Sequence, residues 1–175
     1  DGPWERFRDM QRRLPEAIPG LRVVPAIDLD LSDPIHIGWE GQFRLGRRIA
    51  RVAAPLVDAS LPQRTELRLA TVKFGDSVGS RIWVEYDGVE ERLTSQGMSA
   101  GFRLRNSFTG DDLDALYNAT FDAEHPHRIV LWAAAPLPEG TVLWYGAGCN
   151  PYCNLTDTDD MAAPCFGPVE ILPSR

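Results

Sequence analysis

Hydrophobic positions recur at helical spacing near the start of the chain, three or four residues apart, with Arg and Glu between them. The four positions are Trp4, Phe7, Met10 and Leu14. This spacing predicts an amphipathic helix over residues 3–14. Pro15 should end that helix, because proline lacks the amide hydrogen that a helix interior needs.

A second helical pattern begins at Trp39 and places apolar residues along one side. They are Leu45, Ile49, Val52, Ala53 and Leu56. Pro55 and Asp58 are expected to close this helix. The two predicted helices enclose the mostly apolar run "LRVVPAI" at 21–27, which is typical of a strand buried on both faces in a parallel sheet. Pro25 points to the edge of such a sheet, because it removes one donor from the ladder.

One strand between two helices cannot form a domain by itself, because its backbone N–H and C=O groups would have no neighbour to pair with. We therefore expect the neighbouring strands to come from sequence that precedes Asp1. On this interpretation, residues 1–60 are the closing helix–strand–helix of an α/β domain.

After residue 60 the hydrophobic pattern changes to a period of two. "LPQR" at 61–64 is interpreted as a linker. The alternating segments that follow are "ELRLATVKF", "RIWVEY", "GFRLR", "RIVLWA" and "TVLWY". "YDGVE" at 86–90 carries the Asp-Gly pair of a hairpin turn. Short alternating strands separated by turn residues predict an antiparallel β-sandwich over residues 61–175. The predicted fold class is thus α/β followed by all-β.

Composition narrows the range of partners. The chain has 43% hydrophobic and 25% charged residues, as ordinary globular domains do. A net charge of -7 and a pI near 4.9 argue against a nucleic-acid partner, because such binding depends on clustered Lys and Arg. No apolar run approaches the ~20 residues of a membrane span, so we expect no membrane partner.

All three cysteines fall in the last 27 residues of the chain, at Cys149, Cys153 and Cys165. They match neither a disulfide framework nor a paired metal motif, and we expect no metal and no cofactor. Cys149 and Cys153 in "CNPYC" could bridge across a turn. The odd third thiol favours plain packing instead.

The segment "LDLSDPIHIGWEG" at 29–41 places Asp33 and His36 three residues apart on a predicted loop. A histidine that acts as a general base needs its far ring nitrogen protonated and its ring held, and a carboxylate can supply both. Pro34 fixes one backbone dihedral between the two residues. Both would lie at the carboxyl end of the predicted strand, where open α/β sheets bind ligands. The alternative is an ordinary loop histidine capped by a nearby acid.

Two blocks of the sequence support the first reading. "AIDLDLSDPIHIGWEGQFRLGRRIARVA" resembles the last block of the sialate O-acetylesterase family, carbohydrate esterases of the SGNH (GDSL-like) class, in which a D-x-I-H sequence precedes the final helix of a flavodoxin-like α/β domain. "YGAGCNPYCNLTDTDDMAAPCFGPVEI" resembles the carboxyl end of the same family. The middle of the chain is similar only in its β-rich character.

The resemblance implies a serine ester hydrolase that removes acetyl groups from sugars, with His36 as the base and Asp33 as its orienting acid. In the family the serine belongs to a Gly-Gln-Ser-Asn motif that precedes this block, and that motif is not in this sequence. The expected partners are therefore an acetylated sugar substrate and a missing amino-terminal half of the same enzyme. The competing hypothesis is a non-catalytic carbohydrate-binding or structural β-sandwich module.

Several other residues could carry chemistry. Ser77 in "VKFGDSVGS" matches the serine block of GDSL hydrolases, but the strand pattern that follows it favours a turn. Asp28 and Asp30 could compete for His36, although alternation along "IDLDLSD" predicts that they are solvated or capping. His125 and His127 could suggest a metal pair, but they lack supporting Cys or carboxylate residues at ligand spacing and are interpreted as a surface loop.

Two clusters remain. The acidic run "DTDD" at 157–160 could hold Ca²⁺, but it lacks the Gly and terminal Glu of an EF-hand loop and is interpreted as a solvated turn. Aromatic residues could stack on sugar rings or fill the sandwich core, and the core is favoured for those on strands. They are Trp83, Trp132, Trp144, Tyr145 and Tyr152. Trp39, beside the histidine loop, is a candidate pocket wall.

Overall fold

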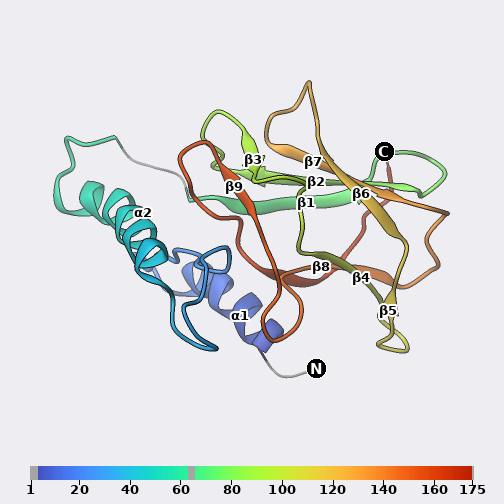
Figure 1. Cartoon of the computed structure of the whole chain (residues 1–175). Helices are drawn as coiled ribbons and strands as arrows, with labels where there is room; N and C mark the ends of the chain where they lie inside the picture. Colours follow the sequence, from blue (N-terminus) through green and yellow to red (C-terminus); the bar gives the residue numbers. More distant parts are fainter. Residues whose placement is uncertain (1–3, 63–65, 175) are drawn as a thin grey trace.

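The computed structural model describes residues 4–62 and 66–174, which form two helices followed by antiparallel strands (Figure 1). The helices are α1 (Trp4–Ala17) and α2 (Trp39–Val57). The strands are β1 (Arg68–Phe74), β2 (Arg81–Asp87), β3 (Leu93–Ser95), β4 (Phe102–Asn106), β5 (Asp112–Leu113), β6 (Leu116–Phe121), β7 (Arg128–Ala133), β8 (Thr141–Tyr145), β9 (Leu155–Asp157) and β10 (Phe166–Glu170). Part of the predicted linker, residues 63 and 64, lies outside the described residues.

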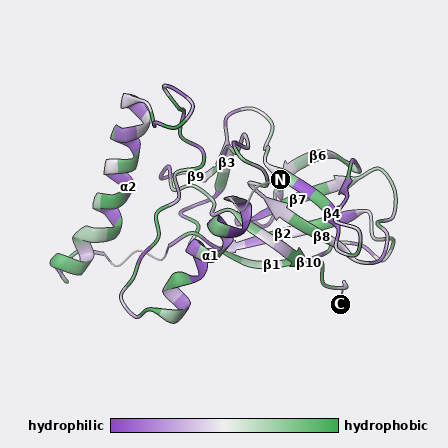
Figure 2. Cartoon of the chain, turned by 90° about the horizontal axis from the view of Figure 1, so that it is seen from below, coloured by the Kyte–Doolittle hydropathy of each residue, from purple (hydrophilic) through white to green (hydrophobic). Residues whose placement is uncertain are grey.

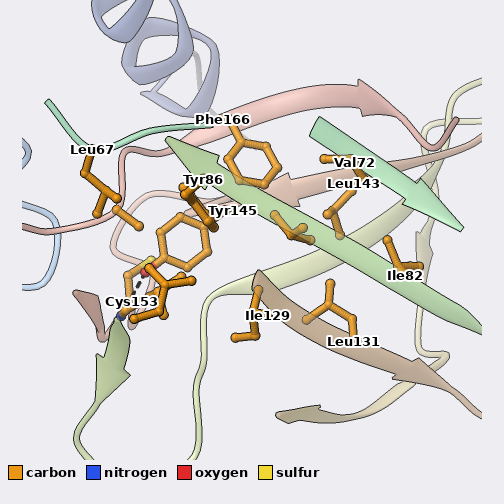
Figure 3. Close-up of a cluster of buried hydrophobic side chains, with 14 of the residues drawn as sticks. Leu67, Val72, Ile82, Tyr86, Ile129, Leu131, Leu143, Tyr145, Cys153 and Phe166 are labelled. Atoms are coloured by element: carbon orange, nitrogen blue, oxygen red, sulfur yellow. Dashed lines mark hydrogen bonds between the residues drawn. The ribbon is translucent and has the colours of Figure 1, made fainter. Parts of the chain in front are cut away.

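Two four-stranded antiparallel sheets form the predicted β-sandwich. Their strand orders are β1-β2-β7-β6 and β10-β8-β4-β5, and β3 pairs with β9 in a separate small sheet. Alternate residues of both sheets point between the layers and make one core, which includes Ile82, Leu131 and Leu143 at no measurable exposure (Figure 3). All five predicted strand segments correspond to strands. In β2 the period-two pattern matches two faces of unequal burial, whereas β8 is buried on both faces.

The predicted hairpin at "YDGVE" was wrong. Gly88 does adopt the left-handed conformation, with φ of 72°, as an Asp-Gly turn requires. However, β2 pairs with β1 and β7, and the turn leads instead into β3, whose partner is β9. The sequence correctly predicted a turn at this position. The strand pairing depends on distant residues, which a local pattern does not contain.

Helix α1 extends beyond its predicted end. Pro15 lies inside it, in the last turn, where it removes only one backbone hydrogen bond. The amide of Ile18 still donates to the carbonyl of Leu14 at 2.9 Å, and Gly20 then turns the chain away with φ of 81°. The predicted stop at Pro15 was therefore too early by one helical turn.

The segment 21–27 forms no strand in this structure, contrary to the prediction. A strand of a parallel sheet needs a neighbour at least on one side. None of the described residues pairs with this segment as a strand, and its apolar side chains are only half-buried. The predicted helix–strand–helix is thus realised as two helices joined by an irregular segment.

Both helices turn their polar faces toward the sandwich. Glu5 and Asp9 of α1 are buried, whereas Trp4, Phe7 and Met10 on its predicted apolar stripe are about half exposed. Glu5 accepts a hydrogen bond from the amide of Gly148 at 2.8 Å, and Asp9 accepts one from the amide of Gly167 at 3.2 Å. The apolar stripe exists as predicted, but these side chains are exposed instead of packed on the β-sandwich. Figure 2 shows hydrophilic and hydrophobic residues alternating along both helices.

Helix α2 has the same orientation. Arg48 on its inner face is completely buried. Phe43, Ile49 and Val57 are 69%, 49% and 89% exposed. An amphipathic helix in a complete globular domain buries its apolar face, so both helices present surfaces that another element would be expected to cover.

Candidate active site

Asp33 and His36 lie on a compact loop between residues 28 and 38. The amide of Ser32 donates to the carbonyl of His36 at 2.8 Å, and the amide of Gly38 donates to the carbonyl of Asp30 at 2.9 Å. These bonds fold the loop back on itself immediately before α2 begins. The local sequence therefore brings the two candidate residues together without help from distant elements.

The Asp33 carboxylate organises the tip of this loop. Its Oδ1 accepts the amides of Ile35 and His36 at 2.9 and 2.8 Å, and its Oδ2 lies 2.7 Å from Nδ1 of the His36 ring. The Ile35 amide and then the His36 ring and amide hold the pKa of Asp33 below its ordinary value. An ionised carboxylate can only accept hydrogen bonds, so the contact favours the tautomer with the proton on Nδ1.

This geometry leaves Nε2 of His36 available as a proton acceptor. The His36 side chain is 68% exposed and that of Asp33 is 46% exposed. The ring is therefore open to solvent while one edge is held by a carboxylate. Such a pair can accept a proton from a hydroxyl and stabilise the imidazolium that results.

A groove of about 800 Å³ adjoins the loop. Pro34 and Ile35 contribute to its wall, which continues along α1 and the 21–27 segment. Its apolar lining includes Trp4, Leu14, Val23, Ile27, Leu31 and Ile37. Trp39, the predicted pocket wall, is 77% exposed at the start of α2.

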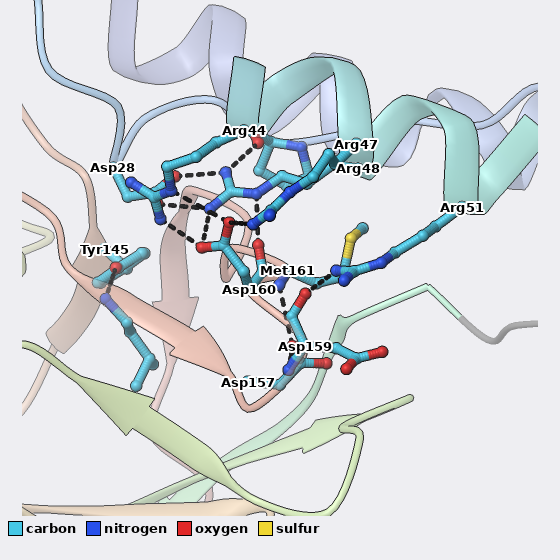
Figure 4. A network of polar contacts seen from close by, with 12 residues as sticks. Asp28, Arg44, Arg47, Arg48, Arg51, Tyr145, Asp157, Asp159, Asp160 and Met161 are labelled. Carbon is cyan, nitrogen blue, oxygen red and sulfur yellow. Dashed lines mark hydrogen bonds and ion pairs between the residues drawn. The ribbon is translucent and has the colours of Figure 1, made fainter. Parts of the chain in front are cut away.

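A buried ion-pair cluster lies beside the base of the same loop (Figure 4). Asp28 faces Arg48 through two bonds of 2.7 and 2.6 Å, and it also accepts from Arg44 at 2.9 Å. Asp160, from the sandwich, completes the cluster by accepting from Arg44 and, at 3.0 Å, from Arg48. Burial alone would lower the pKa of Arg48, but the two carboxylates raise it.

Two predictions were wrong here. Asp28 is neither solvated nor a cap: its side chain is only 3% exposed. The acidic run at 157–160 is not a solvated turn either, because Asp157 is buried and Asp160 is ion-paired. Four arginines at 44, 47, 48 and 51 share one face of α2 and could have signalled the cluster, but their acidic partners are distant in sequence. Asp30 is exposed, as predicted.

Ser77 lies in the turn between β1 and β2, as its sequence context predicted. Asp76 shapes this turn by accepting the amides of Gly79 and Ser80 at 2.7 and 3.1 Å. The turn is at the end of the sandwich away from α2 and the loop that precedes it (Figure 1). The structure therefore does not bring Ser77 to His36.

The other two histidines lie on the loop before β7. The His125 ring is 3.4 Å from Asp122, and it meets the His127 ring edge-on. Within the described ranges, no three His, Cys, Asp or Glu side chains gather as metal ligands would. None of the described helices has the length and apolar character needed to cross a membrane.

Cationic side chains cover the tryptophans of the strands. The Arg128 guanidinium lies 4.1 Å from the Trp83 ring, with Lys73 also near it, and Arg81 and Arg105 lie over Trp132 and Trp144. A covered ring face is not free to stack on a sugar. Trp144 and Tyr145 are buried, whereas Tyr152 is 69% exposed.

The three cysteines are free thiols, so Cys149 and Cys153 are not bridged. Cys149 is exposed, whereas Cys153 and Cys165 are buried next to each other. The contact with Cys165 and then burial raise the pKa of the Cys153 thiol. Packing, favoured in the sequence analysis, describes the two buried thiols.

Comparison with known proteins finds similarity in solved structures but not in sequence families. No protein-family model and no curated protein matches this sequence. The fold resembles that of a carbohydrate acetylesterase. That solved structure, from Xanthomonas citri, superimposes with a TM-score of 0.65 at 22% sequence identity. The match covers 95% of this chain but only 36% of the acetylesterase chain, so this sequence spans about a third of its structural neighbour.

Proposed function

We propose that this chain is the carboxyl-terminal part of a carbohydrate acetyl-esterase, and that it supplies the general base His36 and the orienting acid Asp33. The observation that carries the proposal is the 2.7 Å contact between Nδ1 of His36 and a carboxylate whose other oxygen is fixed by two backbone amides. The similarity in fold to a carbohydrate acetylesterase supports the same activity class.

In the proposed reaction a serine hydroxyl attacks the acetyl carbonyl, and Nε2 of His36 accepts its proton. His36 then returns that proton to the sugar oxygen as the carbon–oxygen bond breaks, which releases the sugar and leaves an acetyl-serine. Water, deprotonated by the same ring, cleaves this ester to acetate and restores the serine. Asp33 holds the Nδ1–H throughout and stabilises the positive charge on the ring.

The serine belongs, on this proposal, to polypeptide that precedes the present sequence. The apolar groove beside the loop and the outward apolar faces of α1 and α2 support this assignment, because they offer a surface next to His36 for the rest of an α/β domain. The half-buried 21–27 segment would then gain the strand neighbours that it lacks. The proposal also includes the serine nucleophile and the sialate ester specificity of the family that the sequence resembles.

The test measures acetate release from 4-nitrophenyl acetate and from acetylated sugars by the full-length gene product. We expect activity, and we expect His36→Ala to lower kcat/KM by about 10³-fold or more. His127→Ala is the matched control, since it removes another exposed imidazole. Ser77→Ala should likewise leave hydrolysis near the wild-type rate.

Two results would refute the proposal. One is a full-length gene product that hydrolyses none of these esters. The other is a His36→Ala variant whose kcat/KM lies within twofold of the wild type, because a general base in the reaction cannot be dispensable. A collapse of activity in Ser77→Ala would move the nucleophile to the β1–β2 turn and would overturn the upstream assignment.

A further inference from the structure

The loop that carries His36 is fastened at its base rather than at its tip. The tip holds itself through Asp33, whose contacts are all within three residues. Such a local turn fixes the histidine relative to Asp33 but not relative to the rest of the molecule. The position of the turn in the molecule therefore depends on the base of the loop, which begins at Asp28 and ends at the start of α2.

The buried carboxylate of Asp28 links the two ends of this loop. Asp28 accepts from Arg48, in the third turn of α2, through a two-bond fork at 2.7 and 2.6 Å. It also accepts from Arg44, one turn earlier, at 2.9 Å. The first end of the loop, at Asp28, is therefore held to the helix that follows the loop. Arg48 has no exposed side-chain surface, so water does not compete for these bonds.

The β-sandwich supplies Asp160 to the cluster. Oδ1 of Asp160 accepts from Arg48 at 3.0 Å and also from Arg44, and its backbone carbonyl accepts from Nε of Arg48. Arg47 also lies 3.8 Å from Oδ2 of Asp160, so three arginines of α2 face two aspartates in this cluster. Without Asp160, the fully buried Arg48 would share the single carboxylate of Asp28 with Arg44, which is unfavourable for a buried charge.

The turn at 157–161 is built to present Asp160. The buried carboxylate of Asp157 accepts the amides of Asp159 and Met161 at 3.0 and 2.9 Å. Asp160 itself has φ of 64°, a left-handed conformation that non-glycine residues seldom adopt. The Asp157 carboxylate therefore holds the turn in the conformation in which Asp160 reaches Arg44 and Arg48.

We propose that Asp160 and Arg48 are positioning residues for the esterase reaction: through Asp28 they fix the His36 loop against the β-sandwich. The inference rests on the proposed function of His36 and Asp33. It assigns the sandwich a role in catalysis without contact to substrate, because one of its turns sets the place of the catalytic base. A misplacement of about 1 Å in such a group is enough to cost ~10²-fold in rate.

Asp160→Asn in the full-length gene product tests the proposal. Asparagine keeps the size of the side chain and tolerates the left-handed backbone, so the substitution removes mainly the charge. The Asp160 side chain is a quarter exposed, which favours folding of the variant. We expect kcat for 4-nitrophenyl acetate to fall between tenfold and a hundredfold, with KM changed less than threefold. Arg48→Lys should act in the same direction, because an ammonium cannot reproduce the fork to Asp28.

Glu85→Gln is the matched control. Glu85 accepts hydrogen bonds from Arg128 and Lys73 on the β1–β2–β7 sheet. Glu85→Gln therefore also replaces an ion-paired carboxylate by an amide. We expect it to lower the thermal midpoint without changing kcat by more than twofold. A second readout is the ¹⁵N spectrum of His36. The proton should stay on Nδ1 in both variants, because Asp33 holds the ring locally. Asp160→Asn, unlike Glu85→Gln, should increase exchange broadening of the His36 ring and of the Ile35 amide, because the whole loop then moves relative to the β-sandwich.

The outcomes separate the two proposals. Equal kcat and unchanged spectra for wild type and Asp160→Asn would overturn the positioning role while leaving His36 as the base. Equal losses of kcat in Asp160→Asn and Glu85→Gln would overturn it as well, since the effect would then be general destabilisation. If the wild type is inactive or His36→Ala is harmless, the proposed function fails, and the loop spectra still decide whether Asp160 fixes the position of the His36 loop.

Discussion

At the scale of single residues, each carboxylate oxygen of Asp33 has a different structural role. Oδ1 accepts the amides of Ile35 and His36, which shapes the turn, and Oδ2 holds the imidazole. The D-x-x-H spacing encodes both tasks, because all the partners lie within three residues. This explains how a short sequence pattern could identify the candidate pair.

Asp33→Asn separates these two tasks. The amide oxygen can still accept the two backbone amides, but a neutral side chain no longer stabilises an imidazolium. We expect the melting temperature to stay within about two degrees of wild type, and kcat of the full-length gene product to fall by about 10⁴-fold, as loss of the triad acid does elsewhere. Asp30→Asn, an exposed acid on the same loop, serves as control. Equal activity of both variants would contradict the role assigned to Asp33.

Gly146 illustrates a residue that no hydrophobic pattern identifies. It has φ of 76°, and a Cβ placed there would lie 2.3 Å from Sγ of Cys165. We expect Gly146→Ala to lower the free energy of unfolding by about 2–4 kcal/mol, from backbone strain and overpacking together. Gly110 has a similar φ of 80° with open space around it, so Gly110→Ala should cost only about 1 kcal/mol. Urea unfolding measures both, and equal losses would contradict the packing argument.

At the scale of elements, local periodicity predicted where the helices lie but not which face of each helix is buried. The stripe of α1 predicted a helix, but its burial is reversed: Glu5 and Asp9 face the sandwich and Phe7 faces outward. The pattern assigns an apolar face without saying which neighbour covers it. The 21–27 run failed for a related reason, because a strand depends on partners that its own residues do not specify.

The β1–β2 turn is an element whose stability should depend on pH. Burial by itself would raise the pKa of Asp76, but hydrogen bonds from Ser80, Arg81 and Gly79 lower it to about 2. A carboxyl with a lowered pKa stabilises the fold above its ordinary pKa, and that contribution is lost as pH falls through the lowered value. We expect Asp76→Asn to cost roughly 1–2 kcal/mol near neutral pH, after allowance for solvent screening.

The measurement is urea unfolding of wild type and Asp76→Asn between pH 6 and pH 2. The difference in unfolding free energy should be constant above about pH 5, where the carboxyl is charged in both states. It should narrow steadily below that, because only the folded wild type then resists protonation. A difference that stays flat down to pH 2 would show that the turn gains nothing from the charge of Asp76.

At the scale of the whole molecule, the sequence predicted the order of two unlike parts, the sandwich and the His36 loop. It did not predict how the parts meet. Arg48 and Asp160 are 112 residues apart, and neither lies in a pattern that names the other. Contacts of this range depend on topology, which local spacing does not determine. The same limit applies to β3 and β9, strands of three residues whose pairing joins distant segments.

The outward apolar faces of α1 and α2 give the last prediction. Phe7 and Phe43 are 45% and 69% exposed, so replacing both by Gln should leave the thermal midpoint of this chain within about two degrees. In a full-length gene product whose preceding residues cover these faces, the same change should cost several kcal/mol, since loss of one buried Phe typically costs about 3–5 kcal/mol. Phe108→Gln, 75% exposed on the sandwich, is expected to be neutral in both proteins. Denaturant unfolding of the two lengths side by side makes the comparison. Equal effects of the double substitution in both would mean that the preceding polypeptide does not pack on the helices, and would remove the main support for an upstream nucleophile.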